Sequence, residues 1–315
     1  MHAAVVTAFD SPPAYREFPR PTTQDPDEVV ADVLAVGLHP RVRSQANGSH
    51  YTSSGDLPLV PGVDGVARTP DGQLRYFVLE DTTMGSMAER TVIDLRRGVV
   101  LPEGADPVAI AAAMNPAMSS WVALRRRISF EPGQSVLVLG ATGNAGRLAV
   151  QVARYLGASH VIGAGRQPGK LATLADLGAD VTVTLDSGEL AKAAADVDVV
   201  IDYLWGPPTA EAMAAVVTAR ANRAQPLSWI EIGSMAGTTA SIPSAALRAA
   251  RLQIVGSGQG SVSTREILAE LPALVQEITA GSFEIDARPT SLTDVEQAWA
   301  DAARPGQRIV ITPQS

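Results

Sequence analysis

The hydrophobic pattern of this 315-residue chain changes near residue 135. Before that point, short β-prone runs are broken by Pro and Gly, a spacing that predicts a compact antiparallel β domain. From residue 135 onward, apolar runs alternate with Ala-rich helical stretches, which predicts repeated βα units on a parallel sheet. The runs of the first part cover residues 3–7, 29–36, 65–69, 75–79 and 88–93.

The second part of the chain carries six predicted strands, the number that fits a doubly wound sheet. Helices are predicted over residues 144–156 and 168–177, because each stretch is followed by a Gly suited to a C-cap. Farther on we expect helices over 264–280 and 293–303 and a last strand over 308–312. The six strands are residues 135–139, 160–164, 181–184, 197–202, 228–232 and 252–255.

Composition and charge narrow the class of protein. The length favours roughly two domains of about 150 residues each, and 46% hydrophobic with 18% charged residues is ordinary for a folded chain. A net charge of -8 gives no electrostatic footprint for nucleic acid or an anionic membrane, so Arg125, Arg126 and Arg127 are interpreted as a solvated helix end. The chain has neither an export signal nor an apolar stretch near the roughly 18 residues of a membrane helix. We therefore expect a cytoplasmic protein without a membrane span.

Residues 135–146 read SVLVLGATGNAG, an apolar strand followed by a Gly-rich turn and an Ala-rich helix. Such a turn lets backbone N–H groups approach a pyrophosphate, and the helix N-terminus adds positive potential. Together with the βα units that follow, it predicts a dinucleotide-binding turn. Its predicted contacts are Gly140, Thr142, Gly143, Asn144, Ala145 and Gly146.

The end of the second predicted strand indicates which dinucleotide is bound. An NAD site carries an Asp or Glu there, about 20 residues past the glycines, but this chain reads VIGAGRQPGK, with no acid before Asp176. Gly165 leaves space, and Arg166 and Lys170 are placed to meet a 2′-phosphate. The sequence therefore favours NADP(H), the alternative being that the two cations are only solvated residues at a helix start.

Five short motifs, in this order and spacing, resemble the medium-chain dehydrogenase/reductase superfamily in its zinc-free quinone oxidoreductase branch. The resemblance covers nearly the full chain and implies an α/β fold: a Rossmann doubly wound parallel sheet plus a GroES-like β-rich domain. It implies the Rossmann domain over residues 116–261, the GroES-like substrate domain over 1–115 and 262–315, and a homodimer. The motifs are residues 61–65 (PGVDG), 118–121 (MSSW), 141–146 (ATGNAG), 177–180 (LGAD) and 306–310 (GQRIV).

The zinc branch of that superfamily holds its catalytic metal with Cys, His and a further Cys or Asp. The matching positions here are His39, Val63 and Asn115, and the chain contains no Cys. Val63 cannot bind a metal, and a four-cysteine structural zinc lobe is impossible. We therefore expect no metal site, and loss of the Lewis acid makes simple alcohol oxidation an unfavourable assignment.

Without a metal, hydride transfer suits an acceptor that is already electrophilic, such as a quinone or an α,β-unsaturated ketone, for which one hydrogen-bond donor is enough. The resemblance favours Tyr51 as that donor. Tyr203 is the rival, since it lies just past the fourth strand of the sheet, where it and Trp205 could line the pocket. His39 is a third candidate, able to donate to ribose or substrate, and simple packing is the alternative for all of them.

Further cofactor contacts follow from the resemblance. Ser119 matches a Thr or Ser near the nicotinamide ribose. The residues after the fifth and sixth strands are expected to approach the nicotinamide and to close over that end of the cofactor. They are Ile232, Gly233, Ser234, Gly258 and Gln259, with Tyr203 beside them.

Three functions stay open at the level of sequence. The leading one is an NADPH-dependent, zinc-independent reductase of a small quinone or enone. The second is a metal-free carbonyl reductase of a specialised metabolite. The third is a protein that binds NADPH as a sensor or partner without efficient turnover, because no catalytic residue is indispensable on sequence grounds.

Overall fold

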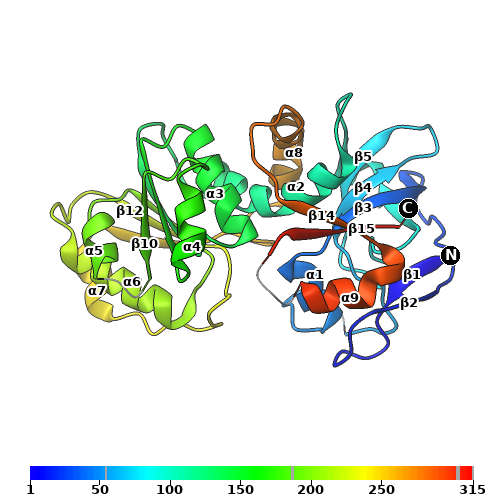
Figure 1. Ribbon diagram of the computed structural model, residues 1–315, viewed down its shortest axis with the longest axis horizontal. Coiled ribbons are helices and arrows are strands. Elements are labelled where there is room, and N and C mark those ends of the chain that lie inside the picture. Colours follow the sequence, from blue (N-terminus) through cyan, green and yellow to red (C-terminus); the bar gives the residue numbers. More distant parts are fainter. Residues whose placement is uncertain (54, 186–187, 303–305, 314–315) are drawn as a thin grey trace. The chain divides into compact units, whose positions relative to one another are not determined.

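The structure is a computed structural model that describes residues 1–53, 55–185, 188–302 and 306–313. The chain divides into two compact units (Figure 1). The first unit combines both ends of the chain, Met1–Asn115 and Leu268–Ser315, and the second is Pro116–Ile267. The assignment of one unit to the substrate and the other to the cofactor stays a prediction.

The first unit is built on a sheet whose strands follow the order β14-β15-β3-β4-β5-β7, with β6 paired to β3. Its pairs are antiparallel except for β14 with β15, which are parallel, so the predicted antiparallel sheet is confirmed for the first hundred residues. A separate antiparallel pair joins β1 and β2. The strands are β1 (His2–Val5), β2 (Ala14–Glu17), β3 (Glu28–Gly37), β4 (Asp64–Arg68), β5 (Leu74–Val78), β6 (Arg90–Asp94), β7 (Gly98–Val100), β14 (Ala287–Ser291) and β15 (Arg308–Thr312).

Short helices complete the core of the first unit. Helices α1 (Pro40–Ala46) and α9 (Val295–Asp301) lie beside each other in Figure 1. Val42 of α1 and Trp299 of α9 both belong to one apolar cluster with residues of β1, β3 and β15. The predicted helix over 293–303 is shorter than expected, and Ala303 lies outside the described residues.

The second unit holds a six-stranded parallel sheet in the order β10-β9-β8-β11-β12-β13. Numbered along the chain this order is 3-2-1-4-5-6, the doubly wound arrangement, with its switch point between β8 and β11. All six predicted strands are therefore confirmed, with ends that differ by at most two residues. They are β8 (Ser135–Leu139), β9 (His160–Gly165), β10 (Val181–Thr184), β11 (Val199–Asp202), β12 (Leu227–Glu231) and β13 (Leu252–Gly256).

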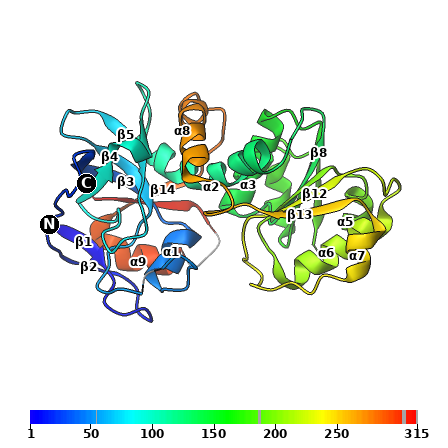
Figure 2. The ribbon, with the colours of Figure 1, turned by 180° about the vertical axis from the view of Figure 1, so that it is seen from behind.

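Helices cover both faces of this parallel sheet. One face packs against α5 (Glu189–Ala193), α6 (Gly206–Ala219) and α7 (Ser244–Ala249) in a single apolar cluster. Helix α3 (Asn144–Tyr155) lies on the side away from α6 (Figure 2). The long helix α8 (Thr264–Thr279) passes from the second unit into the first. Because both faces are covered, the strands read as continuous apolar runs.

The predicted helix over residues 168–177 is wrong in length. Only α4 (Pro168–Leu171) is α-helical, and a 3₁₀ turn follows over Ala172–Leu174. The Thr173 hydroxyl donates to the Lys170 carbonyl at 3.0 Å, three residues back, which favours the tighter turn. Leu174 is buried and ends the element against the sheet.

Helix α2 (Pro107–Val122) continues into a π-helical turn, Ala123–Arg127, and crosses from the first unit to the second. Together they form the one helix in the described residues that is long and apolar enough to cross a membrane by length and composition, and 67% of its most apolar window is buried in the protein. The sequence pattern did not predict this helix, because Asn115, Pro116 and Ser119 interrupt the apolar runs.

The basic run at the end of this helix is more than a solvated end. The Arg127 Nε donates to the Gly256 carbonyl at 2.7 Å, which ties the π-helical turn to the end of β13. The Arg125 guanidinium lies over the Trp121 ring, 5.3 Å from its centroid.

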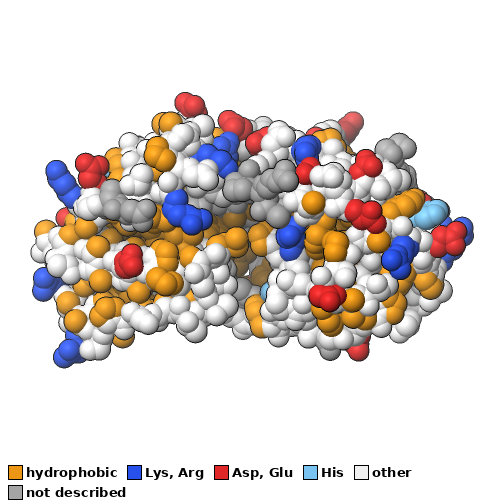
Figure 3. Space-filling view, turned by 60° about the horizontal axis from the view of Figure 1, so that its bottom comes forward, with side chains coloured by type: hydrophobic (Ala, Val, Ile, Leu, Met, Phe, Trp, Pro, Cys, Tyr) orange, Lys and Arg blue, Asp and Glu red, His pale blue; other side chains and the backbone are white. Residues whose placement is uncertain are grey.

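The face of the molecule in Figure 3 shows Lys and Arg side chains as separate spots, without a continuous basic patch.

Substitution of Gly146 tests how tightly the turn after β8 is packed. A Cβ at this position would lie 2.3 Å from the Gly140 carbonyl oxygen and 2.6 Å from the Ala141 Cα. Because backbone cannot yield as a side chain tip can, we expect Gly146→Ala to lower the free energy of unfolding by about 1–3 kcal/mol, measured by urea denaturation. Gly169→Ala is the control, since nothing lies within 4 Å there; equal stability of the two variants would contradict the packing argument.

Candidate active site

The turn after β8 leads into a helix whose N-cap residue has no side chain that could cap its backbone N–H groups. Gly140 has φ +81, a conformation that other residues rarely adopt. Helix α3 begins at Asn144, and its N-cap residue Gly143 makes no side-chain cap hydrogen bond. Among the described residues, a Cβ on Gly143 would have the Gly140 oxygen as its one neighbour within 4 Å, at 3.6 Å, so the turn is open on its outer side. The first N–H groups of α3 are thus available to an anion, as a pyrophosphate requires.

At the end of β9, Gly165 packs closely against the glycine turn, and two basic residues follow it. Gly165 is buried, and a Cβ there would lie 2.8 Å from the Thr142 Cγ2. Arg166 is exposed and Lys170 is partly buried in the next turn. The next turn is linked to α3, because Arg147 Nη1 donates to the Thr173 hydroxyl at 3.1 Å.

Arg147 is a basic residue of this edge that sequence reasoning missed. It lies in the first turn of α3, one residue past the glycine turn. Through Thr173, whose hydroxyl donates to the Lys170 carbonyl, it shares a hydrogen-bonded link with the segment that carries Lys170. A basic residue directly after the third glycine was the signal that could have indicated it.

The loops after β8, β11 and β12 converge on Tyr203 and Leu204, at the switch point of the sheet. A Cβ on Gly140 would lie 3.1 Å from the Leu204 Cδ2 and 3.4 Å from the Tyr203 Cβ. The Tyr203 carbonyl accepts from the Met235 N–H at 3.2 Å, and a Cβ on Gly233 would lie 3.2 Å from the same oxygen. The structure thus brings the glycine turn, Tyr203 and Gly233 together at the edge where ligands bind in such sheets.

Tyr203 and Ser119 form a directed hydrogen bond. The Ser119 hydroxyl donates to the Pro116 carbonyl at 2.6 Å, so its oxygen accepts the Tyr203 hydroxyl proton across 2.8 Å. Burial raises the pKa of Tyr203 to about 12. A phenol that is buried, hydrogen-bonded and raised in pKa is a weak acid, and its proton is directed to Ser119.

Asp202 holds this loop in place. It is completely buried at the end of β11, and its carboxylate accepts four hydrogen bonds within 2.6–3.1 Å. The donors are the Leu204 N–H, the Trp205 N–H, the Thr209 hydroxyl and the Trp229 indole N–H. Sequence reasoning treated Asp202 only as the last residue of a strand.

The remaining predicted contacts of this unit lie at the same edge of the sheet. Ile232 and Gly233 follow β12, and both donate their N–H groups to the Asp202 carbonyl, at 2.8 and 3.2 Å. Gly258 N–H donates to the Ser261 hydroxyl at 2.8 Å in the turn after β13. Ser234 and Gln259 lie in these same two loops.

The first unit contains a separate buried polar cluster around Asp64. His39 Nε2 lies 3.0 Å from the Asp64 Oδ1, and the Tyr76 hydroxyl donates to Oδ2 at 2.7 Å. Arg308 is also buried and donates to the Leu38 carbonyl at 2.9 Å. Burial lowers the pKa of Arg308 to about 10, an effect opposed by the charge of Asp64. His39 is thus held in a network rather than exposed to solvent.

The positions that match zinc ligands offer a poor donor set for a metal ion. His39 turns its Nε2 to Asp64, and Val63 is a buried aliphatic residue. In the described ranges, no three His, Cys, Asp or Glu side chains are grouped so as to hold a metal ion. The donor set that His39, Val63 and Asn115 offer contains a single good ligand for zinc.

Tyr51 lies on a loop of the first unit with its side chain 72% exposed. Its ring packs on His50, with centroids 4.2 Å apart. Burial and the charge of Arg41 lower the pKa of His50 to about 4, so His50 is neutral at pH 7. Arg41 also donates to the Thr52 hydroxyl at 3.0 Å, which fixes the residue after Tyr51.

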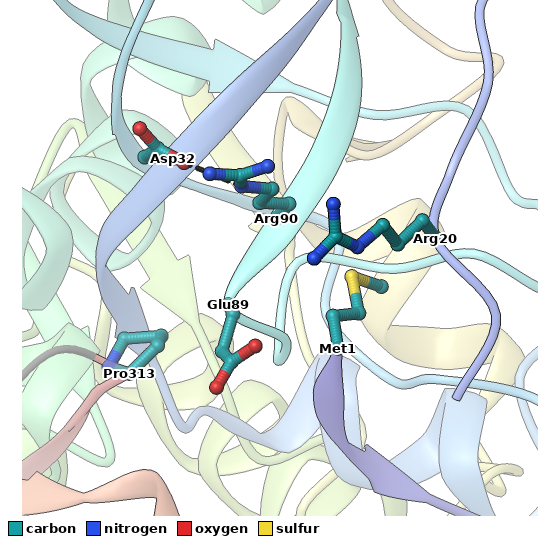
Figure 4. A pocket seen from close by; sticks show the side chains of 6 residues that line it. All are labelled: Met1, Arg20, Asp32, Glu89, Arg90 and Pro313. Carbon is teal, nitrogen blue, oxygen red and sulfur yellow. Dashed lines mark hydrogen bonds and ion pairs between the residues drawn. The ribbon is translucent and has the colours of Figure 1, made fainter. Parts of the chain in front are cut away.

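A hollow of about 260 Å³ lies elsewhere in the first unit, lined by charged side chains (Figure 4). Its acids are already occupied: Asp32 accepts from Arg90 at 2.7 Å, and Glu89 accepts from the His2 N–H at 2.9 Å. Asp32 lies on β3, whose last residue, Gly37, is two residues before His39. Asp32 and Gly37 are five residues apart, roughly 16 Å along the strand. The hollow is therefore separate from the His39 cluster, and both of its acids already have hydrogen-bond partners.

Comparison with known proteins identifies the family. A family model described as a zinc-binding dehydrogenase matches residues 145–278. A protein of Emericella nidulans named "probable NADPH-dependent quinone reductase" is 32% identical over 363 aligned positions, covering 99% of this chain and 100% of the relative. This chain is a medium-chain dehydrogenase/reductase of the quinone oxidoreductase-like branch.

Solved structures of this family confirm the predicted Rossmann and GroES-like fold. The quinone oxidoreductase of Thermus thermophilus, solved also in complex with NADPH, is 27% identical, with a TM-score of 0.79 over 99% of this chain and 100% of that one. Among the relatives found by sequence, a chloroplastic NADPH-dependent alkenal/one oxidoreductase of Arabidopsis thaliana is 26% identical over 194 residues, which cover 56% of this chain and 50% of the relative.

The geometry of this medium-chain reductase sorts the predicted residues into two groups. In the second unit, Ser119, Tyr203 and the glycine turn are joined by the contacts described above. Tyr51 and His39 belong to the first unit. Tyr51 is 72% exposed, whereas His39 is buried. The role of each residue in binding or catalysis stays a prediction.

Glu231 offers a test of the electrostatics at the sheet edge. It is half-buried at the end of β12, in register with Asp202, and burial and the charge of Asp202 raise its pKa above the ordinary 4.5. The folded state therefore resists loss of its proton, so the contribution of Glu231 to stability falls as pH rises from the ordinary value through the raised one. We expect Glu231→Gln to gain stability relative to the parent protein at pH about 8, and to gain less at pH about 4.

Urea denaturation at the two pH values measures this difference. Glu211→Gln is the control, because Glu211 is exposed on α6. A gain for Glu231→Gln that does not change with pH would contradict the assignment.

Proposed function

We propose that this chain reduces a quinone or an α,β-unsaturated carbonyl compound with NADPH, without a catalytic metal. The observation that carries the proposal is the edge of the parallel sheet: an uncapped helix N-terminus after the glycine turn, and Arg166 and Lys170 after Gly165 where an NAD site has an acid. The named activities of the relatives support the same reaction class.

The residues present fit the cofactor. The uncapped N–H groups of α3 suit the pyrophosphate, and Arg166 and Lys170 suit a 2′-phosphate, by a forked contact and a point charge. Ser119, oriented by Tyr203 and Pro116, offers a fixed hydroxyl at the switch point. NADPH, when bound, supplies the hydride; the chain binds and orients it and keeps water away.

The chemistry of the donor set supports the proposed zinc independence. Val63 has no lone pair to offer, and His39 Nε2 is committed to Asp64. An enone or quinone needs no Lewis acid, because conjugation carries the developing charge to an oxygen that one hydrogen-bond donor can stabilise.

We propose Tyr51 as that donor. Its ring is exposed, while the loop that carries it is fixed by the Arg41 to Thr52 hydrogen bond. Tyr203 is the weaker candidate, since its pKa is raised to about 12 and its proton goes to Ser119. His39 is the other candidate, because its buried Nδ1 has no hydrogen-bond partner among the described residues.

Two expectations from the resemblance stay predictions. One is the homodimer, for which β13 offers an edge strand. The other is the cytoplasmic location.

NADPH oxidation with a panel of quinones and enones tests the function. We expect turnover that a chelator such as EDTA leaves unchanged, and a kcat/KM for NADPH at least about tenfold above that for NADH. An enone should yield the saturated ketone; an alcohol as sole product would instead indicate carbonyl reduction. Binding of NADPH without turnover on the whole panel would favour a sensor.

The double variant Arg166→Ala and Lys170→Ala tests the cofactor assignment within the same assay. Loss of two charge-assisted contacts should lower kcat/KM for NADPH by about 10–100-fold and leave NADH unaffected. The matched control is Lys192→Ala, the other lysine of the chain, which is exposed on α5. Equal use of NADH and NADPH by the parent protein would refute the argument.

The donor assignment is tested by Tyr51→Phe, which removes only the hydroxyl. A general acid contributes about 10²–10⁴-fold, so kcat should fall by about 100-fold or more with the KM for NADPH unchanged. Tyr203→Phe is the comparison: Ser119 loses its donor, so the KM for NADPH should rise more than kcat falls. Full turnover by Tyr51→Phe would remove Tyr51 from the mechanism and leave His39→Gln as the next variant to measure.

A further inference from the structure

Trp205 has a backbone conformation that is rarely open to its residue type. Its φ is 51° and its ψ is −167°, and among the described residues it is the one non-glycine with positive φ. A bulky side chain in this region costs free energy, and such residues persist only where the surroundings impose them. Observed strain of this kind is a reason to look for a function at the residue.

The surroundings of Trp205 do impose its conformation. The buried Asp202 carboxylate accepts the Leu204 and Trp205 N–H groups at 2.8 and 3.1 Å. The Leu204 carbonyl accepts the Ala236 N–H at 2.7 Å, which joins the loop to the one after β12. Gly206 follows with φ +70, and a Cβ there would lie 2.8 Å from the Ala236 oxygen. The loop is clamped on both sides of Trp205.

Packing of the Trp205 indole in the apolar core does not offset this strain. Leu204, its neighbour, packs against the apolar cluster of the sheet, whereas Trp205 is not part of that cluster and stays partly exposed. Asp202 would hold the loop with any residue other than proline at position 205, because its bonds to the loop come from the backbone N–H groups of Leu204 and Trp205. A glycine would adopt the same φ without strain.

The position of Trp205 indicates what the indole contacts. A Cβ on Gly140 of the glycine turn would lie 3.1 Å from the Leu204 Cδ2, so Trp205 directly follows a residue at the switch point. In the adjacent loop, the side chain of Met235 is 70% exposed, although its N–H is fixed by Tyr203. Exposed apolar side chains on clamped backbone at a ligand edge are typical of a binding wall.

We infer that the Trp205 indole stacks on a planar conjugated ring bound at the carboxyl end of β11. The inference rests on the proposed function, which supplies two such rings: the nicotinamide of the cofactor and the ring of a quinone acceptor. Flat rings favour offset stacking on indole, and the rigid backbone lowers the entropy cost of holding the indole in place. Trp205 is thus a specificity residue whose strained backbone is retained for ligand contact.

The first experiment measures strain by comparing Trp205→Gly with Trp205→Ala. Both remove the indole, but only Gly relaxes the positive φ, so the Gly variant should have the higher melting temperature. At an ordinary position the order is the reverse. Glu211→Gly and Glu211→Ala on the exposed side of α6 give that ordinary order as the control. A Trp205→Gly variant that melts below Trp205→Ala would overturn the strain argument.

The second experiment measures ring binding with Trp205→Ala and the conservative Trp205→Phe. If nicotinamide is the ring, Trp205→Ala weakens NADPH binding about tenfold and leaves the binding of 2′,5′-ADP, which lacks nicotinamide, unchanged. If the acceptor ring is bound, the KM for an aromatic quinone rises about tenfold, while NADPH binding and the KM for an acyclic enone stay the same. Trp205→Phe should restore most of the loss in either case.

Unchanged values in both arms would overturn the inference, and so would equal losses for 2′,5′-ADP and NADPH, which indicate damage to the whole site. The result is separable from the fate of the proposed function. If no acceptor oxidises NADPH in the parent protein, the reductase proposal fails, while the melting comparison still tests the strain and the two nucleotide titrations still test stacking on nicotinamide.

Discussion

The organisation of the candidate site depends on one buried carboxylate. Asp202 lies at the centre of the parallel sheet with no exposure to solvent, and four donors satisfy it: two backbone N–H groups, a hydroxyl and an indole N–H. A buried charge is tolerated only when it is hydrogen-bonded in this way. Because two of the donors belong to the residues that follow it, the carboxylate shapes its own loop, and that loop positions Tyr203 against the glycine turn. On the neighbouring strand β12, burial and the negative charge of Asp202 raise the pKa of Glu231.

The sequence predicted the framework well, because the framework follows from local signals. Apolar runs of strand length alternating with helical stretches located all six parallel strands, and the glycine turn indicated its own ligand edge. The predicted helix over 168–177 was wrong in length because a 3₁₀ turn follows its first four residues. The Thr173 hydroxyl bond and the burial of Leu174 favour this turn. The spacing of apolar residues does not distinguish a 3₁₀ turn from an α-helix over so few residues.

The rest of the site depends on contacts between distant segments and on backbone angles. Arg308 reaches the Leu38 carbonyl across 270 positions of sequence, and no local pattern predicts that meeting. Trp205 could be suspected as a wall residue from its place after a strand, but its positive φ is set by Asp202 and by the loop after β12. Likewise, the hydrogen bond of Tyr203 to Ser119 and its burial make it a weaker candidate for proton donor than its place after the strand suggests.

Lys170 has a consequence that reaches beyond cofactor choice. The whole chain contains two lysines, Lys170 beside the end of β9 and Lys192 on α5. Reagents that acylate side-chain amines therefore have very few targets on this protein, and one of them stands at the edge where the glycine turn opens. Covalent labelling of lysine, with peptide mass mapping to tell the two sites apart, would read the occupancy of this edge directly, with the amine on α5 as an internal reference.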